Sequence, residues 1–180
     1  PLNFGEFINY KDPKLYAQYI NSKINESNIF LFITYFNEFI KYGGYPGVVT
    51  SDNKEFILKN LLNTYLLKEV KDILSYKSTH EFEQILKILA LNDTTILNKS
   101  NVSNDTGLNI HKVNEIINVL EKTYVIKKLR PFKDNKIAEL IKSNKIFFMD
   151  LGFKNILINN FNDLDKRHDK GAIFESFIFN

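Results

Sequence analysis

The polar side chains that could do chemistry gather in one short stretch of the chain. Asn109, His111, Lys112 and Asn114 lie on the polar face of an amphipathic segment whose apolar residues recur at helical spacing. When a helix enters the major groove of DNA, such side chains can contact phosphates and base edges. We therefore treat these four residues as candidate nucleic-acid-binding residues.

Positive charge is concentrated in and after this stretch. From Asn109 to Lys145, nine Lys or Arg stand against four Asp or Glu, so this segment carries +5 and the remainder −2 of a total of +3. A local excess of this kind is typical of a phosphate-binding surface, although a solvated face of a Lys-rich protein would show it too. The basic residues that we add to the candidates are Lys127, Lys128, Arg130, Lys133 and Lys136.

Two features argue against base-specific recognition. The polar face contains no Arg, the residue that pairs most specifically with guanine, and Glu115 on the same face would repel phosphate. We therefore expect binding to double-stranded DNA of modest affinity and low sequence specificity. The alternative is a module for contact with a protein partner or for self-association.

The residues of most catalytic and metal sites are missing from this sequence. It has no phosphate-binding Gly-x-x-x-x-Gly-Lys-Ser/Thr loop and no Cys, and His80, His111 and His168 are scattered. No Ser-His-Asp order and no paired-carboxylate spacing stands out. We expect no catalytic residue, no metal ligand and no cofactor in this chain itself.

The elements around these candidates are predicted from periodicity and turn signals. Residues 95–132 indicate a helix, a glycine turn, a second helix and an extended segment, followed by a strand over Lys145–Asp150, which together predict a winged helix-turn-helix. Asp12-Pro13 starts an upstream helix, and another covers Ile29–Tyr42 before the Gly43-Gly44 stop. The predicted fold class is mostly α with a small β-sheet: a helical bundle followed by a winged helix-turn-helix domain.

The other expected boundaries are less marked. No helix start precedes the first ten residues. Ser51 or Asp52 is expected to cap the helix that runs through Phe56 and Leu61, and Ser78 or Thr79 is expected to cap the first helix of the winged domain. The domain boundaries that we predict are 1–76 for the bundle, 77–150 for the winged helix and 151–180 for a helical connector. The apolar pattern stops abruptly at both ends, so we expect a piece of a longer protein. We also expect this protein to be cytoplasmic and to have no membrane segment.

Several short motifs, taken in order, resemble one family. Residues 1–7 (Pro-Leu-Asn-Phe-Gly-Glu-Phe) resemble the end of the nucleotide-binding core of archaeal and bacterial AAA-type ATPases, and residues 43–46 (Gly-Gly-Tyr-Pro) resemble the Gly-Gly-x-Pro motif of their helical lid. Residues 130–132 and 145–152 resemble the winged-helix region that follows. Residues 170–175 resemble the entry to a PD-(D/E)XK nuclease-like module.

The resemblance implies a function for the longer protein. Its parent would be an ATPase that binds ATP and Mg²⁺ through residues upstream of Pro1, with most of the nuclease-like module downstream of Asn180. Lid motifs of this kind approach the adenine, which nominates Gly44 and Pro46 as cofactor-binding residues. The competing interpretation is that Gly43-Gly44 merely ends a helix, and the residues themselves favour it.

Overall fold

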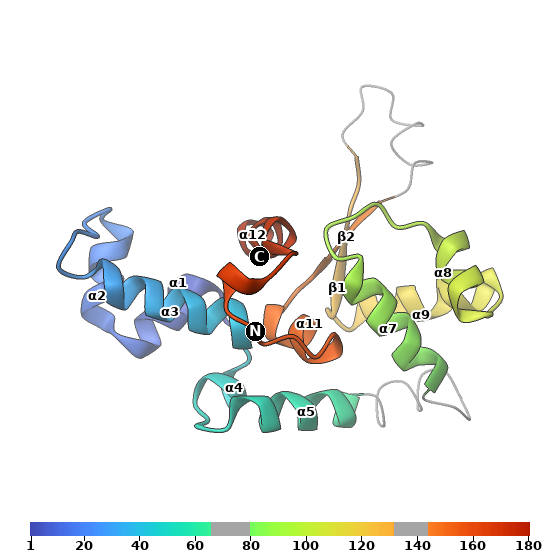
Figure 1. Ribbon diagram of the computed structural model, residues 1–180, viewed down its shortest axis with the longest axis horizontal. Coiled ribbons are helices and arrows are strands. Elements are labelled where there is room, and N and C mark those ends of the chain that lie inside the picture. The colour runs from blue at the N-terminus through green and yellow to red at the C-terminus, as the bar shows by residue number, and fades with distance from the viewer. Residues whose placement is uncertain (66–79, 132–143) are drawn as a thin grey trace. The chain divides into compact units, whose positions relative to one another are not determined.

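The protein divides into two compact units. In the computed structural model, which describes residues 1–65, 80–131 and 144–180, Pro1–Lys59 groups with Asp150–Ile178 and Asn180, and Asn60–Met149 groups with Phe179. The described elements are mostly helices, together with one two-stranded antiparallel sheet, so the predicted class of a mostly α protein with a small β-sheet is confirmed (Figure 1). Most of residues 151–180, which we expected to form a connector, belong to the first unit.

The first unit is helical in its described residues. Its elements are α1 (Phe4–Lys11), α2 (Pro13–Ile20), α3 (Ile29–Tyr42), α4 (Pro46–Val49), the start of α5 (Lys54–Tyr65), α11 (Leu151–Leu157), the 3-10 turn η2 (Leu164–Lys166) and most of α12 (Lys170–Phe179). The helix over Ile29–Tyr42 has the predicted bounds. The predicted start of α2 is also confirmed, because Asp12 Oδ1 accepts the amides of Lys14 at 2.9 Å and Leu15 at 3.0 Å.

One helix start was not predicted, and one predicted start is wrong. Helix α1 begins within the first ten residues, where the side chains of Asn3 and Glu6 cap each other's backbone amides at 2.9 and 2.8 Å. Helix α5 begins at Lys54, so Asn53, rather than Ser51 or Asp52, offers its side chain to the first turn, accepting the Phe56 amide at 3.3 Å.

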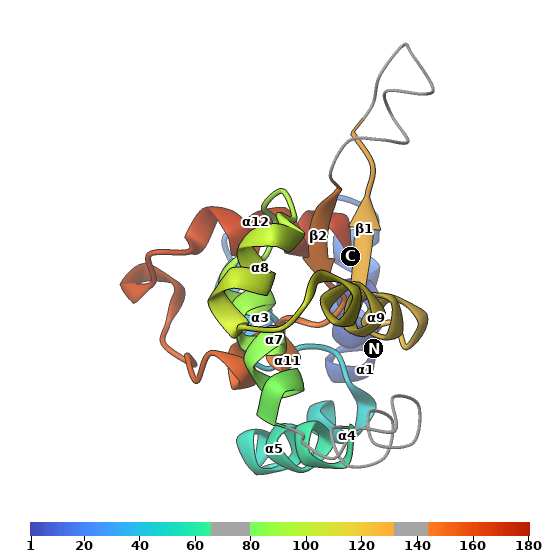
Figure 2. The same ribbon diagram turned by 90° about the vertical axis from the view of Figure 1, so that its right-hand side faces the viewer.

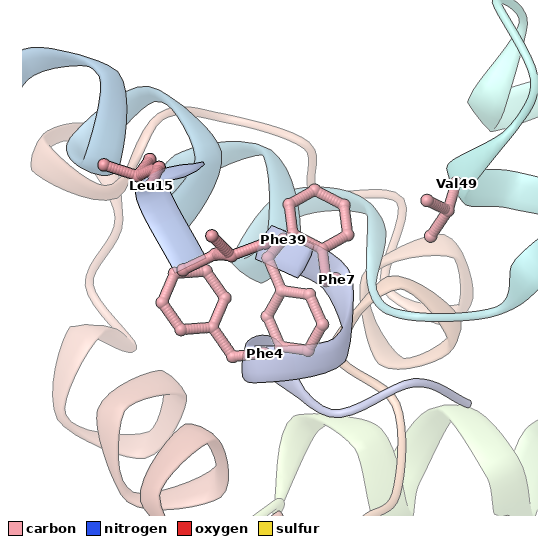
Figure 3. Packing of buried hydrophobic residues seen from close by; sticks show 6 residues of the cluster. Phe4, Phe7, Leu15, Phe39 and Val49 are labelled. Carbon is pink, nitrogen blue, oxygen red and sulfur yellow. The ribbon is translucent and has the colours of Figure 1, made fainter. Parts of the chain in front are cut away.

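Helix α1 forms because its apolar residues have a core to enter. Phe4, Phe7 and Ile8 are buried in a cluster with Leu15, Phe39 and Val49 (Figure 3). The Phe4 ring lies 5.3 Å from the rings of both Phe39 and Phe177, centroid to centroid. Each buried Phe contributes about 1.5–3 kcal/mol of transfer free energy, so the cluster ties α1, α3 and α12 together.

In its described residues, the second unit contains the end of α5, three further helices and the sheet. The described elements after α5 are α7 (His80–Leu91), α8 (Lys99–Thr106), α9 (Ile110–Lys122), β1 (Ile126–Leu129) and β2 (Lys145–Phe148), which Figure 2 shows beside one another. The register pairs Ile126 with Phe148 and Leu129 with Lys145. The predicted strand over Lys145–Asp150 is confirmed for its first four residues.

The turn between α8 and α9 has the predicted chemistry. Gly107 follows α8 in the left-handed conformation (φ 70°, ψ 5°), which glycine adopts at the least cost. Asn109 then caps α9, since its Oδ1 accepts the Lys112 amide at 2.9 Å. The predicted caps of α7, Ser78 and Thr79, lie outside the described residues. The assignment as a winged helix-turn-helix stays a prediction.

Candidate functional site

Three glycines bring distant backbone segments into contact in the first unit. Gly43 ends α3 with φ 75° and ψ −167°, a combination that essentially only glycine adopts. A Cβ on Gly44 would lie 2.2 Å from the Leu2 carbonyl oxygen, and one on Gly152 would lie 2.0 Å from that of Tyr42. We call Gly43, Gly44, Asp150 and Gly152 the glycine junction, because the N-terminal segment, the end of α3 and the start of α11 meet there.

The carboxylate of Asp150 holds the glycine junction together. Its Oδ2 accepts the Gly44 amide at 2.7 Å, and its Oδ1 accepts the Phe153 amide at 2.8 Å as the N-cap of α11. Burial raises the pKa of Asp150 to about 6, although the backbone amides of Gly44, Phe153 and Gly152 act in the opposite direction. This buried carboxylate was missed as a site residue, because residues 145–150 look like a strand.

The two predicted cofactor-binding residues differ in exposure. Gly44 is buried, and both of its backbone polar groups are used: its N–H donates to Asp150, and its carbonyl accepts the Leu2 amide at 2.7 Å. Pro46 is exposed and is the first residue of α4. The interpretation of Gly43-Gly44 as a helix stop is confirmed, and the approach of Gly44 and Pro46 to adenine remains a prediction.

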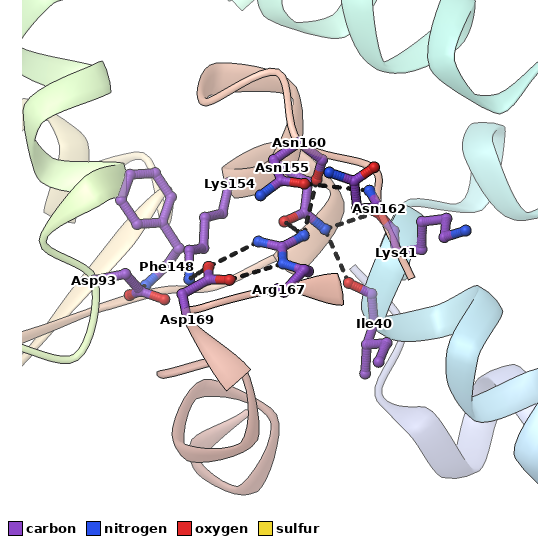
Figure 4. A network of polar contacts seen from close by, with 10 residues as sticks. All are labelled: Ile40, Lys41, Asp93, Phe148, Lys154, Asn155, Asn160, Asn162, Arg167 and Asp169. Atoms are coloured by element: carbon purple, nitrogen blue, oxygen red, sulfur yellow. Dashed lines mark hydrogen bonds and ion pairs between the residues drawn. The ribbon is translucent and has the colours of Figure 1, made fainter. Parts of the chain in front are cut away.

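A second buried polar cluster lies around α11 (Figure 4). Asn155 is fully buried and donates to the carbonyls of Ile40 at 2.9 Å and Lys41 at 2.8 Å, so it satisfies the end of α3. Its Oδ1 accepts a hydrogen bond from Arg167 Nη1 at 2.8 Å. Arg167 also donates Nε and Nη2 to the Asp169 carboxylate at 2.8 and 2.7 Å.

This cluster is electrostatically matched. Lys154 is almost completely buried and lies 3.3 Å from Asp169, which therefore faces two cations. Partial burial raises the pKa of Asp169, but Arg167 and Lys154 outweigh it and lower the pKa to about 2. No sequence pattern singles these residues out. Asn155 bonds to the end of α3, and Arg167 bonds to both Asn155 and Asp169, so the cluster fits a structural role in holding α11 on α3.

The predicted nucleic-acid-binding residues of α9 serve different purposes. Asn109 is exposed, but its Oδ1 caps the helix, and His111 is exposed. Lys112 Nζ lies 2.8 Å from Glu81 Oε2 on α7, so this cation is already paired with an acid. Asn114 is half-buried.

The predicted residues on the hairpin also differ from one another. Lys127 and Arg130 are exposed, whereas Lys128 Nζ is 2.6 Å from Glu121 Oε2 on α9. Lys127 and Lys128 are neighbours on β1, where successive side chains point to opposite faces. Lys133 and Lys136 lie outside the described residues. Of the described candidates, His111, Lys127 and Arg130 therefore present the most accessible polar or charged groups.

The parts of the chain that the structure describes contain neither a metal-binding cluster nor a membrane-spanning helix. Within residues 1–65, 80–131 and 144–180, no group of three or more His, Asp or Glu side chains is arranged to hold a metal ion. Over the same residues, no helix combines the length and the apolar character needed to cross a membrane.

Fold and candidate sites define a mostly helical protein with a small antiparallel sheet and a basic helix–hairpin region. The chain belongs to the family described as "Domain of unknown function (DUF8612)", whose model matches residues 33–164. It is 25% identical over 158 residues to an uncharacterized protein of Haemophilus influenzae, covering 83% of this chain and 40% of that protein. It is 26% identical over 187 aligned residues to the uncharacterized protein MJ1544 of Methanocaldococcus jannaschii, and this match covers 99% of this chain and 39% of that protein.

The chain thus spans about two fifths of the length of these relatives. No solved structure gave a significant match.

Proposed function

We propose that the second unit is a winged helix-turn-helix that binds double-stranded DNA with modest affinity and low sequence specificity. The observation that supports this most is the order of its elements, in which α8, the Gly107 turn and α9 lead directly into the β1–β2 hairpin. A helix pair with a glycine turn is a frequent DNA-binding arrangement. Exposed cations follow along the same stretch at Lys122, Lys127 and Arg130.

Low specificity follows from the exposed face of α9. The side chains there recur at helical spacing and are His111, Glu115, Asn118 and Lys122. Base readout relies on forked pairing by Arg, Asn or Gln, and this face offers one amide and no Arg. Phosphate contacts from Lys and Arg would then supply most of the affinity, with little dependence on sequence.

We further propose that this unit belongs to the C-terminal part of an AAA-type ATPase. The motifs of residues 1–7 and 43–46 support this context, and the relatives leave about three fifths of their length for other parts. ATP and Mg²⁺ would be bound mainly outside this chain. Because Gly44 is buried, the exposed Pro46 is the better candidate for contact with nucleotide.

Salt dependence tests the DNA proposal. Fluorescence anisotropy with a labelled random-sequence duplex should show binding that weakens steeply with salt, because each neutralised phosphate releases counterions. The double variant Lys127→Ala/Arg130→Ala should lower the slope of log K against log salt by about two if both residues contact phosphate. The matched control is Lys112→Ala, which removes a cation already paired with Glu81 and should leave the slope nearly unchanged.

Two results would reject the proposal for this face. One is the absence of binding at low salt. The other is a double variant whose slope equals that of the wild type.

Contact with a protein partner is the second candidate for the same unit. It is favoured by the pairing of Lys112 and Lys128 with acids, and by Tyr124 and Leu129, which are 76% and 45% exposed beside the hairpin. Neutralised charges and exposed apolar side chains suit a protein interface better than a phosphate backbone. Rejection of DNA binding in the salt experiment would leave this candidate in its place.

A further inference from the structure

The sheet of the second unit has an open edge at Ile96. This residue pairs with Lys145 on β2, and the flanking hydrogen bonds run from Ile146 N–H to Thr95 O at 3.1 Å and from Leu97 N–H to Asn144 O at 2.8 Å. In an antiparallel ladder, the residue between such bonds belongs to a non-hydrogen-bonded pair, so its own N–H and C=O face away from the partner strand. The backbone groups of Ile96 therefore face the outer edge of the sheet.

The outward backbone groups of Ile96 are available. Among the described residues, no hydrogen bond uses its N–H or its C=O, and its side chain is 68% exposed. An edge strand with unpaired backbone groups is a template for a further strand, and peptide-binding domains use such edges.

A cavity of about 130 Å³ adjoins this edge. Apolar side chains of α7, α8 and β2 line it, including Leu89, Val102 and Ile146, while Ile96 belongs to its wall. For comparison, a cavity of about 150 Å³ can hold a benzene molecule, so the volume suits one medium-sized side chain, which would meet both apolar and polar side chains. Edge and cavity together present the two features of strand addition, which are backbone pairing and a side-chain pocket.

The polar lining of the cavity indicates which peptide would fit. Asn92, Asn98 and Asn101 line it with amides that can pair with peptide backbone, and Asp105 is the one charged residue among the described residues that line it. The exposed carboxylate of Asp105 in the wall of the cavity favours a basic residue on the same face of the bound segment, two positions from the residue that enters the cavity.

We propose that the Thr95–Leu97 edge and the adjoining cavity bind an extended segment of a protein partner. The segment pairs with the N–H and C=O of Ile96 and places one apolar side chain in the cavity. It directs a Lys or Arg two positions along, whose side chain lies on the same face of an extended segment, to Asp105. This inference is independent of DNA binding, since it uses neither the exposed face of α9 nor the cations of the hairpin.

The probes for this proposal are short capped peptides of the pattern Lys-Thr-X-Thr-Lys, in which X is Leu, Ile, Val, Phe or Ser and both Lys side chains lie on the same face as X. We expect at least one apolar-X peptide to shift the NMR amide signals of residues 95–97 with a Kd below about 1 mM. The Ser peptide should bind roughly ten-fold or more weakly, because its short side chain leaves most of the cavity unfilled and does not reach the apolar side chains that line it. The proposal is overturned if no peptide shifts these signals at about 1 mM, or if the Ser peptide binds as well as the apolar ones.

Two variants at one position test backbone pairing. Ile96→Pro removes the outward N–H and breaks no described hydrogen bond of the sheet, and Pro is tolerated at strand edges. Ile96→Ala is the matched control, because it shortens the same side chain and keeps the N–H. Binding should be about five-fold or more weaker in Ile96→Pro than in Ile96→Ala, the loss expected for one hydrogen bond. Equal affinities would overturn backbone pairing.

Two further measurements keep the proposal testable. If Ile96→Pro does not fold, the best peptide is methylated in turn at each backbone nitrogen, and at least one position should abolish binding. Retained binding of every methylated peptide would contradict strand addition. Asp105→Asn should weaken binding of the Lys-containing peptide but not of one with Ser in place of both Lys, and an equal effect on both would remove Asp105 from the site.

Discussion

Replacing Gly152 with alanine separates local helix propensity from tertiary packing, because the two effects have opposite signs. Gly152 is the second residue of α11, and within a helix Ala is more favourable than Gly by up to about 1 kcal/mol. Local propensity alone therefore predicts a more stable protein. At the glycine junction, however, the new Cβ would lie 2.0 Å from the Tyr42 carbonyl oxygen and 2.9 Å from the Gly43 nitrogen.

The packing effect should be the larger of the two. Ordinary contact begins at 3.4 Å, so α11 and the end of α3 must separate by about 1.4 Å (3.4 − 2.0 = 1.4). Overpacking of this kind costs about 1–3 kcal/mol. The same movement stretches the bonds from Asn155 to Ile40 and Lys41, and loss of one buried hydrogen bond adds about 1–3 kcal/mol. After subtraction of about 1 kcal/mol for helix propensity, the net destabilisation is about 1–5 kcal/mol, a large part of a typical total.

Urea denaturation followed by far-ultraviolet circular dichroism measures this difference. The control is Gly171→Ala, since Gly171 is the second residue of α12 and a Cβ there meets nothing within 4 Å. We expect Gly171→Ala to be as stable as the wild type or up to about 1 kcal/mol more stable, and Gly152→Ala to have a much lower midpoint at a similar m value. A Gly152→Ala midpoint equal to or above that of the wild type would refute the close approach of α11 to α3.

The remaining predictions concern pH. The folded-state pKa of Asp150 is raised to about 6, so the folded state binds more protons than the unfolded state between about pH 4 and 6. The free energy of unfolding should therefore fall by up to about 3 kcal/mol as pH rises through this window. Asp150→Asn should remove this slope. The pKa of Asp169 is lowered to about 2, so its contribution should be present above about pH 4 and be lost as pH falls towards 2, and Asp169→Asn should flatten that acid limb. Urea midpoints measured from pH 2 to 8 check both, and a variant with the wild-type slope in its window would contradict the corresponding assignment.

Local signals were sufficient for much of the fold. The Asp12-Pro13 start, the Ile29–Tyr42 helix and the Gly107 turn were predictable because capping, periodicity and backbone freedom act within a few residues. The start of α1 was also within reach, since Asn3 and Glu6 have the spacing of a capping box.

The candidate DNA-binding residues were predictable only by type. Their charge and position in the sequence are local facts, but their availability depends on neighbours that other elements supply. Lys112 pairs with Glu81, which is 31 residues away, and Lys128 pairs with Glu121 on another element. The availability of a cation is therefore a property of packing, which helical or strand periodicity does not encode.

By itself, the sequence determined the helical class of the protein, most helix positions and the basic segment, because these depend on interactions between near neighbours. Only the tertiary structure revealed the glycine junction, where Asp150 accepts the amide of Gly44 across 106 residues, and the open edge at Ile96. It also placed the Asn155 side chain at the end of α3 and the Arg167 guanidinium against Asn155. Such contacts are decided when hydrophobic burial brings distant backbone together, since each buried polar group must then find a partner among the groups that packing has placed nearby.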